Sequence, residues 1–263
     1  MASSKSIFLK SFFYLSLLTS SILSLSSTSE AYSQLDRVEI PLERVLAPYN
    51  GYDDNDQVEV ILQGALPNAC YTLADTFYRS EDDGSTITVR QYAIKLSDDI
   101  CDQGSILPAH LAAAVPFTNS IALGTLPSAE YSISFFTNGD RSGTRILNVA
   151  PANSSLVDSK PYAVVNTILV PSLVQKGSQT TITLNGVLNS ECVDLAEKFE
   201  IILERDVLVV LPTLKIDATA QSCAQVTRPY SRNVVIPGFK AGKTLVHVRS
   251  MNGKSLNAVV ESR

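Results

Sequence analysis

Short runs of apolar and β-branched residues recur along the chain, and each run ends at residues that favour turns. Runs with a period of two, or fully apolar runs of five to ten residues, are typical of β-strands. Helical periodicity is scarce and is confined to one short stretch, residues 105–114. The predicted strands are residues 58–63, 86–94, 131–136, 145–149, 180–185, 207–216, 244–249 and 256–260.

Two predicted strand pairs are joined by Asn-Gly, at Asn138-Gly139 and Asn252-Gly253. Asn-Gly between two alternating runs is the strongest short-range signal for a β-hairpin. The acidic stretch Glu81–Gly84 lies between residues 77–79 and a predicted strand, and we expect it to form another hairpin tip.

The same pattern is present twice in the chain. Residues 60–77 align with residues 182–199 at a constant offset, with identical leucines, one identical glycine, one alanine, one phenylalanine and one cysteine. Internal repetition at this scale is the signature of tandem structural units. We therefore predict an all-β fold of two tandem antiparallel β-sandwich domains. The predicted boundaries are 34–152 and 163–263, with 153–162 as the linker.

The two copies differ most in one segment. Asp102–Val115 in the first copy is longer than its counterpart and contains His110, one of the two histidines in the chain. We expect this insert to form a loop with a short helix on the rim of the first sandwich.

The N-terminus has the features of a secretory signal peptide. Lys5 and Lys10 precede an apolar run diluted by serine and threonine, and small residues allow cleavage after Ala31 or Ser33. A membrane anchor is the alternative, but a span needs about 20 predominantly apolar residues, and this run is interrupted. Residues 1–33 are therefore predicted to direct export, giving a secreted or periplasmic protein with no membrane span after cleavage.

Four cysteines in an exported chain allow three disulfide pairings. The repeat favours one of them, Cys70–Cys101 with Cys192–Cys223, because the cysteines keep the same register in both copies. A zinc site would need closely spaced cysteines or nearby histidines, which the sequence lacks. A redox pair would also need close spacing.

The cysteines belong to a longer motif. The first copy has Gly64-Ala-Leu-Pro-Asn-Ala-Cys70, then Pro116-Phe117, then Leu126-Pro-Ser-Ala-Glu-Tyr131. This arrangement resembles uncharacterised immunoglobulin-like modules of secreted bacterial proteins. The second copy departs from it, with Asn189 in place of the proline and Thr244 in place of the tyrosine. The resemblance implies an immunoglobulin-like fold and export, and it implies no catalytic residues.

Composition excludes several partners and activities. The formal net charge is −5 and no cluster of Lys or Arg is present, so nucleic acid and anionic membranes are poor candidate partners. No Gly-x-Ser-x-Gly nucleophile elbow and no phosphate-binding glycine loop is found. We therefore expect a protein that is not an enzyme and uses no cofactor.

Two groups of residues are candidates for binding. Asp53, Asp54 and Asp56 resemble the acidic run that binds calcium between cadherin repeats, but the second copy has no matching acids. A solvated turn is the alternative for these aspartates. Aromatic residues concentrate in the first copy, and a binding face is expected there, made by Tyr49, Tyr52, Tyr71, Tyr78 and His110.

The sequence thus predicts an exported, non-catalytic two-domain β-sandwich protein. We expect it to act as a binding module, or as a spacer module, for a protein or a cell-surface glycan. A calcium-rigidified adhesion module and an unrecognised hydrolase are the two alternatives.

Overall fold

The computed structural model describes residues 37–263 except 82, 97–100, 102–108, 138, 154–155 and 221, and it does not describe the side chains of residues 109 and 110. The predicted signal peptide and most of the predicted insert lie outside the described residues. Residues Leu35–Arg263 form one compact unit. Within the described residues, no helix has the length and apolar character needed to cross a membrane.

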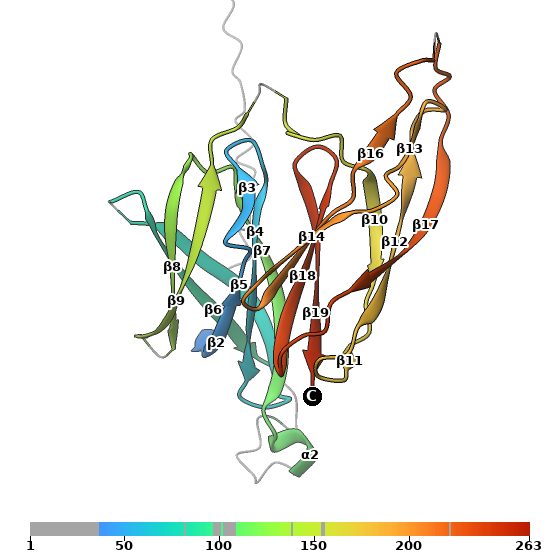
Figure 1. Ribbon diagram of the computed structural model, residues 1–263. Helices are drawn as coiled ribbons and strands as arrows, with labels where there is room; N and C mark the ends of the chain where they lie inside the picture. Colours follow the sequence, from blue (N-terminus) through green and yellow to red (C-terminus); the bar gives the residue numbers. More distant parts are fainter. Residues whose placement is uncertain are drawn as a thin grey trace, which may run out of the picture. The chain divides into compact units, whose positions relative to one another are not determined.

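Two sheets make up the first half of this unit (Figure 1). The smaller sheet has the order β2 (Leu42–Leu46), β4 (Val58–Leu66), β7 (Val115–Gly124). The larger has the order β1 (Arg37–Ile40), β6 (Thr86–Lys95), β8 (Ala129–Thr137), β9 (Asp140–Ala150), β3 (Asn50–Asp53), with β5 (Tyr71–Ser80) also paired to β6. A short helix, α2 (Ala109–Ala112), lies within the predicted helical stretch.

Equivalent strands recur in the second half. The smaller sheet has the order β10 (Val164–Leu169), β12 (Thr180–Leu188), β17 (Arg228–Ile236). The larger has the order β11 (Leu173–Val174), β19 (Lys254–Ser262), β18 (Gly242–Ser250), β15 (Val207–Leu211), β14 (Glu200–Glu204). A two-stranded ribbon, β13 (Val193–Leu195) with β16 (Leu214–Ile216), completes it.

The repeated glycines show why the two halves adopt the same local structure. A Cβ atom on Gly64 would lie 2.3 Å from the carbonyl oxygen of Pro41 and against the ring of Phe117. A Cβ atom on Gly186 would lie 1.9 Å from the carbonyl oxygen of Val164 and against the ring of Tyr230. Both contacts exclude any side chain, so glycine is required at this place in each copy. The duplication seen in the sequence therefore extends to atomic contacts.

The expectation of wholly antiparallel sheets is wrong. β3 pairs in parallel with β9 and β6 with β8, and the second half repeats this as β11 with β19 and β15 with β18. After β6 the chain crosses to the smaller sheet as β7 and then returns as β8, and a crossover of this kind brings two strands side by side in the same direction. The sheets are mixed, and an immunoglobulin-like topology is not confirmed.

One predicted strand is divided in two. Residues 207–216 form β15 and β16, which pair in different sheets, and the break falls at Pro212-Thr213. Proline has no N–H to donate and so interrupts a ladder. The predicted hairpins agree better: Thr137 pairs with Asp140 across Asn138-Gly139, and Ser250 pairs with Lys254 across a three-residue turn.

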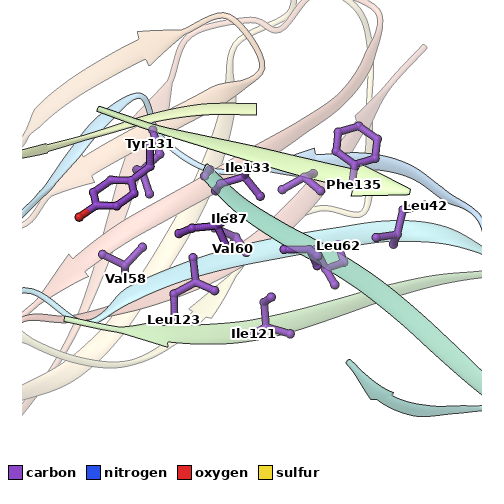
Figure 2. Packing of buried hydrophobic residues seen from close by; sticks show 14 of the residues in the cluster. Leu42, Val58, Val60, Leu62, Ile87, Ile121, Leu123, Tyr131, Ile133 and Phe135 are labelled. Carbon is purple, nitrogen blue, oxygen red and sulfur yellow. The ribbon is translucent and has the colours of Figure 1, made fainter. Parts of the chain in front are cut away.

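A hydrophobic core lies between the two sheets of the first half (Figure 2). Val58, Val60 and Leu62 of β4 point into it from the smaller sheet, and Ile87 and Ile133 point into it from the larger. Each such side chain contributes about 1.5–3 kcal/mol when fully buried. A second cluster occupies the same place in the second half, with Ile182, Leu184, Leu208, Val246 and Val248 among its members.

Both predicted disulfides are confirmed. Cys70 bonds to Cys101 and Cys192 to Cys223, each pair with a sequence separation of 31, and no cysteine is left free. In the first half, Cys70 directly precedes β5 and Cys101 follows β6, the strand paired with β5. In the second half, Cys192 directly precedes β13 and Cys223 follows β16, the strand paired with β13.

Removing one disulfide will destabilise the protein. We expect Cys192→Ala/Cys223→Ala to lower the free energy of unfolding by about 2–4 kcal/mol, because the cross-link no longer restricts the unfolded chain. Urea denaturation of the double variant beside the oxidised native protein measures the loss. If dithiothreitol left the urea midpoint of the native protein unchanged, the assignment of the disulfides would be contradicted.

Candidate binding site at the junction of the two halves

Two adjacent strands of the larger sheet of the second half, β15 and β18, are buried on both faces. Leu208, Val210 and Val246 point into the core of that half, whereas the alternate residues Val207, Val209 and Leu245 belong to a separate buried cluster. That cluster also contains Leu46 of β2 and Ile61 of β4, both from the first half. Adjacent residues of a strand point to opposite faces, so β15 and β18 join the two halves through their outer face.

The matched positions of the first copy have the opposite character. In the second copy, Val207 pairs with Leu245 and Val209 pairs with His247. The matched pairs of the first copy are Thr86 with Ser132 and Thr88 with Ser134. The outer positions are thus polar in the first copy and largely apolar in the second. Sequence reasoning missed this junction, although the unbroken apolar run Val207–Leu211 was the signal for a strand covered on both faces.

Polar contacts surround the apolar junction cluster. Arg145 of β9 forms an ion pair with Asp206 at 2.7 Å, and it also donates to the carbonyl of Ala47. Asn50 donates to Glu204 from its backbone N–H at 3.2 Å and from its side chain at 3.3 Å. Charged and amide groups from both halves therefore fix the edges of the junction.

A cavity of about 210 Å³ lies within this junction. Three of its lining residues, Tyr52, Asp53 and Asp56, were predicted as binding or calcium-binding candidates. Sequence reasoning missed the others, among which Tyr162 and Arg249 belong to the second half. The remaining polar wall is made by Asn50, Asn148, Asn153 and Ser159.

A buried ion pair forms one wall of the cavity. Arg249 Nη2 donates to Asp56 Oδ1 at 2.5 Å, and the two residues are only 3% and 1% exposed. Arg249 also lies over the ring of Tyr162, 5.3 Å from its centroid, and its Nη1 is 3.4 Å from the carbonyl of Gly51. The guanidinium has five N–H donors, so the pair with Asp56 leaves donors for a ligand in the cavity.

Burial and charge act in opposite directions on this pair. Burial raises the pKa of the Asp56 carboxyl, and the hydrogen bond and charge of Arg249 oppose that rise. For Arg249, burial lowers the pKa of the guanidinium, but the hydrogen bond and charge of Asp56 outweigh it and hold the pKa above its usual value. The pair therefore presents one donor group and one acceptor group with nearly balanced charge.

His247 is buried beside the cavity. Its Nδ1 donates to Asn257 Oδ1 at 2.9 Å, Asn257 Nδ2 donates to Glu59 Oε2 at 2.7 Å, and the imidazole packs edge-on against Tyr52. Among the described residues, its Nε2 atom has no hydrogen-bond partner. The pKa of His247 is lowered to about 4, chiefly by burial; the hydrogen bond with Asn257 opposes this shift and the charge of Arg249 adds to it.

Stability should therefore fall as the solution becomes acidic. The pKa of His247 is about 4 in the folded state and near 6.5 when unfolded, so between these values the unfolded chain binds the proton and the folded protein does not. We expect His247 to remove about 3 kcal/mol of stability between pH 6.5 and pH 4. Urea denaturation at several pH values measures this slope. His247→Gln keeps a side-chain amide for Asn257 but cannot take up a proton, so the variant's stability should depend less on pH between these values. A slope equal to that of the native protein would contradict the assignment.

The predicted tyrosine face is not a single surface. Tyr52 is only 4% exposed, and its hydroxyl donates to the carbonyl of Glu59, so its assignment to an exposed face is wrong. The ring belongs to the core cluster of the first half, and it also packs edge-on against His247 of the second half. Tyr49 and Tyr78 are exposed, while Tyr71 is half-buried against the core. His110 belongs to α2, and its side chain lies outside the described residues.

The three candidate calcium ligands have structural partners. Asp53 Oδ1 accepts from the backbone N–H of Asn55, Asp54 Oδ1 accepts from that of Ala152, and Asp56 binds Arg249. Within the part of the chain that the structure describes, no three His, Cys, Asp or Glu side chains are grouped to hold a metal ion.

Comparison with models of known families, with curated proteins and with solved structures finds no match for this chain.

Proposed function

We propose that this protein is an exported, non-catalytic binding module built from two immunoglobulin-like sandwiches, and that the junction cavity binds one neutral sugar unit of a surface glycan. Export is supported by the two disulfides, which persist in oxidising compartments. The duplicated pairs of sheets, each pair enclosing its own core, support the sandwich description.

The observation that carries the proposal is the chemistry of the cavity wall. Arg249 supplies donors and Asp53 supplies acceptors, while Asn153 and Ser159 supply both. A sugar ring presents hydroxyl groups that donate and accept around its edge, and this mixture of partners satisfies both roles.

Size and charge narrow the ligand further. A cavity of about 150 Å³ holds a benzene-sized molecule, so about 210 Å³ accepts one six-membered ring with substituents. The positive charge of Arg249 is matched by Asp56, and Asp53 and the nearby Glu204 add negative charge. An anionic ligand would be repelled, which favours a neutral sugar.

Filling the cavity tests the proposal. Ala150 lines the cavity, whereas Ala129 is exposed on β8 outside it. On an array of neutral and sialylated glycans, we expect the native protein and Ala129→Leu to bind the same neutral glycans. Ala150→Leu is expected to lose at least tenfold in affinity because leucine occupies the ligand's space.

Thermal melts of both variants confirm that each is folded before the arrays are compared. Absence of binding to neutral glycans, or equal binding by Ala150→Leu and the native protein, would contradict the proposal. Binding that disappears with a chelator and returns with calcium would favour the adhesion-module alternative instead.

A further inference from the structure

A groove of about 620 Å³ adjoins the junction cavity, and the two spaces share Ser159 and Tyr162 as a common wall. The rest of the groove is formed by the segment that precedes β10, by β16 and by the turn between β18 and β19. Val157, Ile216 and Met251 are its main apolar residues. A ligand in the cavity therefore has the groove directly beside it.

The groove leaves apolar side chains open to solvent. Ile216 is 58% exposed and Val157 is 43% exposed, although both are large apolar residues. The two side chains line the same groove, so together they offer an apolar surface that an apolar partner would bury.

Both charged residues of the groove wall are already engaged. The Asp158 carboxylate accepts from the backbone N–H groups of Asn252 and Gly253, at 2.6 and 2.9 Å. The Lys160 ammonium group donates to Glu200 at 2.6 Å. Lys160 is thus held in an ion pair and Asp158 by two backbone N–H groups, so neither charge needs a partner from an occupant of the groove, which suits an uncharged chain.

The backbone of β16 offers little to a peptide. One edge of this strand pairs with β13, and at the other edge the N–H of Leu214 donates to the carbonyl of Pro161. Strand addition needs a run of free backbone groups along an edge, and β16 is only three residues long with the N–H of Leu214 already bonded. An aliphatic chain needs no hydrogen bonds and fits this surface better than an extended peptide does.

We infer that the groove binds the aliphatic chain of an amphipathic glycoconjugate whose sugar lies in the junction cavity. The sugar half of this ligand rests on the proposed function, and the apolar half rests on the groove alone. Tyr162 lies at the point where the two halves of the ligand meet.

The groove is tested with the neutral apolar dye Nile red and the full protein. We expect Ile216→Lys to weaken dye binding at least fivefold. Leu169→Lys is the matched control, since Leu169 is 60% exposed on β10 and does not line the groove. We expect 1-decanol to displace the dye from the native protein. Equal dye binding by the two lysine variants, or no displacement by decanol, would overturn the inference.

The link between the two spaces is tested with a sugar that binds on the array. Its decyl glycoside, below the concentration at which micelles form, should bind at least tenfold more tightly than its methyl glycoside. That advantage should disappear in Ile216→Lys, and equal affinities in the native protein would overturn the inference. If dye binding depends on Ile216 but the native protein binds no glycan, the proposed function is contradicted, and so is the placement of a sugar in the cavity. Glycan binding with dye binding unaffected by Ile216→Lys contradicts the groove alone.

Discussion

Leu245→Asp is expected to lower the free energy of unfolding by about 5 kcal/mol, the largest effect of any substitution considered for this protein. Leu245 is 1% exposed and packs in the cluster that joins the two halves. Aspartate at this position loses the apolar contacts and places a charge among the buried apolar side chains of the cluster. The loss is measured by urea denaturation followed by circular dichroism.

The duplication supplies a matched control for this substitution. Ser132 occupies the equivalent position of the first copy, as the strand registers show, and it is only partly buried. We expect Ser132→Asp to change stability by about 1 kcal/mol or less. Leu245→Ala, with an expected loss of about 2–5 kcal/mol, keeps the measurement possible if the aspartate variant does not fold. Equal losses at positions 132 and 245 would show that β18 is not covered by the first half.

Arg249→Met is expected to cost about 3–5 kcal/mol, because it leaves the Asp56 carboxylate buried without its partner. Methionine keeps most of the aliphatic length of arginine, so the loss reports mainly the unpaired charge. The double variant Asp56→Asn/Arg249→Met should recover part of it, since the amide oxygen of asparagine still accepts from the backbone N–H of Asp53, as Asp56 Oδ2 does now.

The pH dependence of the single variant gives a second check. Burial already raises the pKa of Asp56, and removing the Arg249 charge raises that pKa further. The destabilisation of Arg249→Met should therefore shrink as the solution becomes acidic and the carboxyl takes up a proton. A double variant as unstable as the single one, or a loss that does not depend on pH, would contradict this account of the pair.

The candidate site was only partly visible in the sequence. Tyr52, Asp53 and Asp56 were identified as candidates, and all three line the cavity. Tyr52 was expected on a surface of the first copy, and it is buried in the cavity wall instead. Arg249 gave no signal, because one arginine near the end of a strand has the same pattern whether it faces solvent or a partner 193 residues away.

Local pattern predicted whatever depends on neighbouring residues and on the comparison of the two copies. The strands, the Asn-Gly hairpins, the repeat and the disulfide pairing were all derived in this way, and Gly64 and Gly186 have the matching contacts that a duplication requires. Strand direction, the packing of β15 and β18 against the first half and the cavity at that junction depend on which sheet of one half packs against the other half. Residues far apart in the sequence make those contacts, and the free energy that selects them comes from burying Leu46, Ile61, Val209 and Leu245 together, which no local pattern specifies.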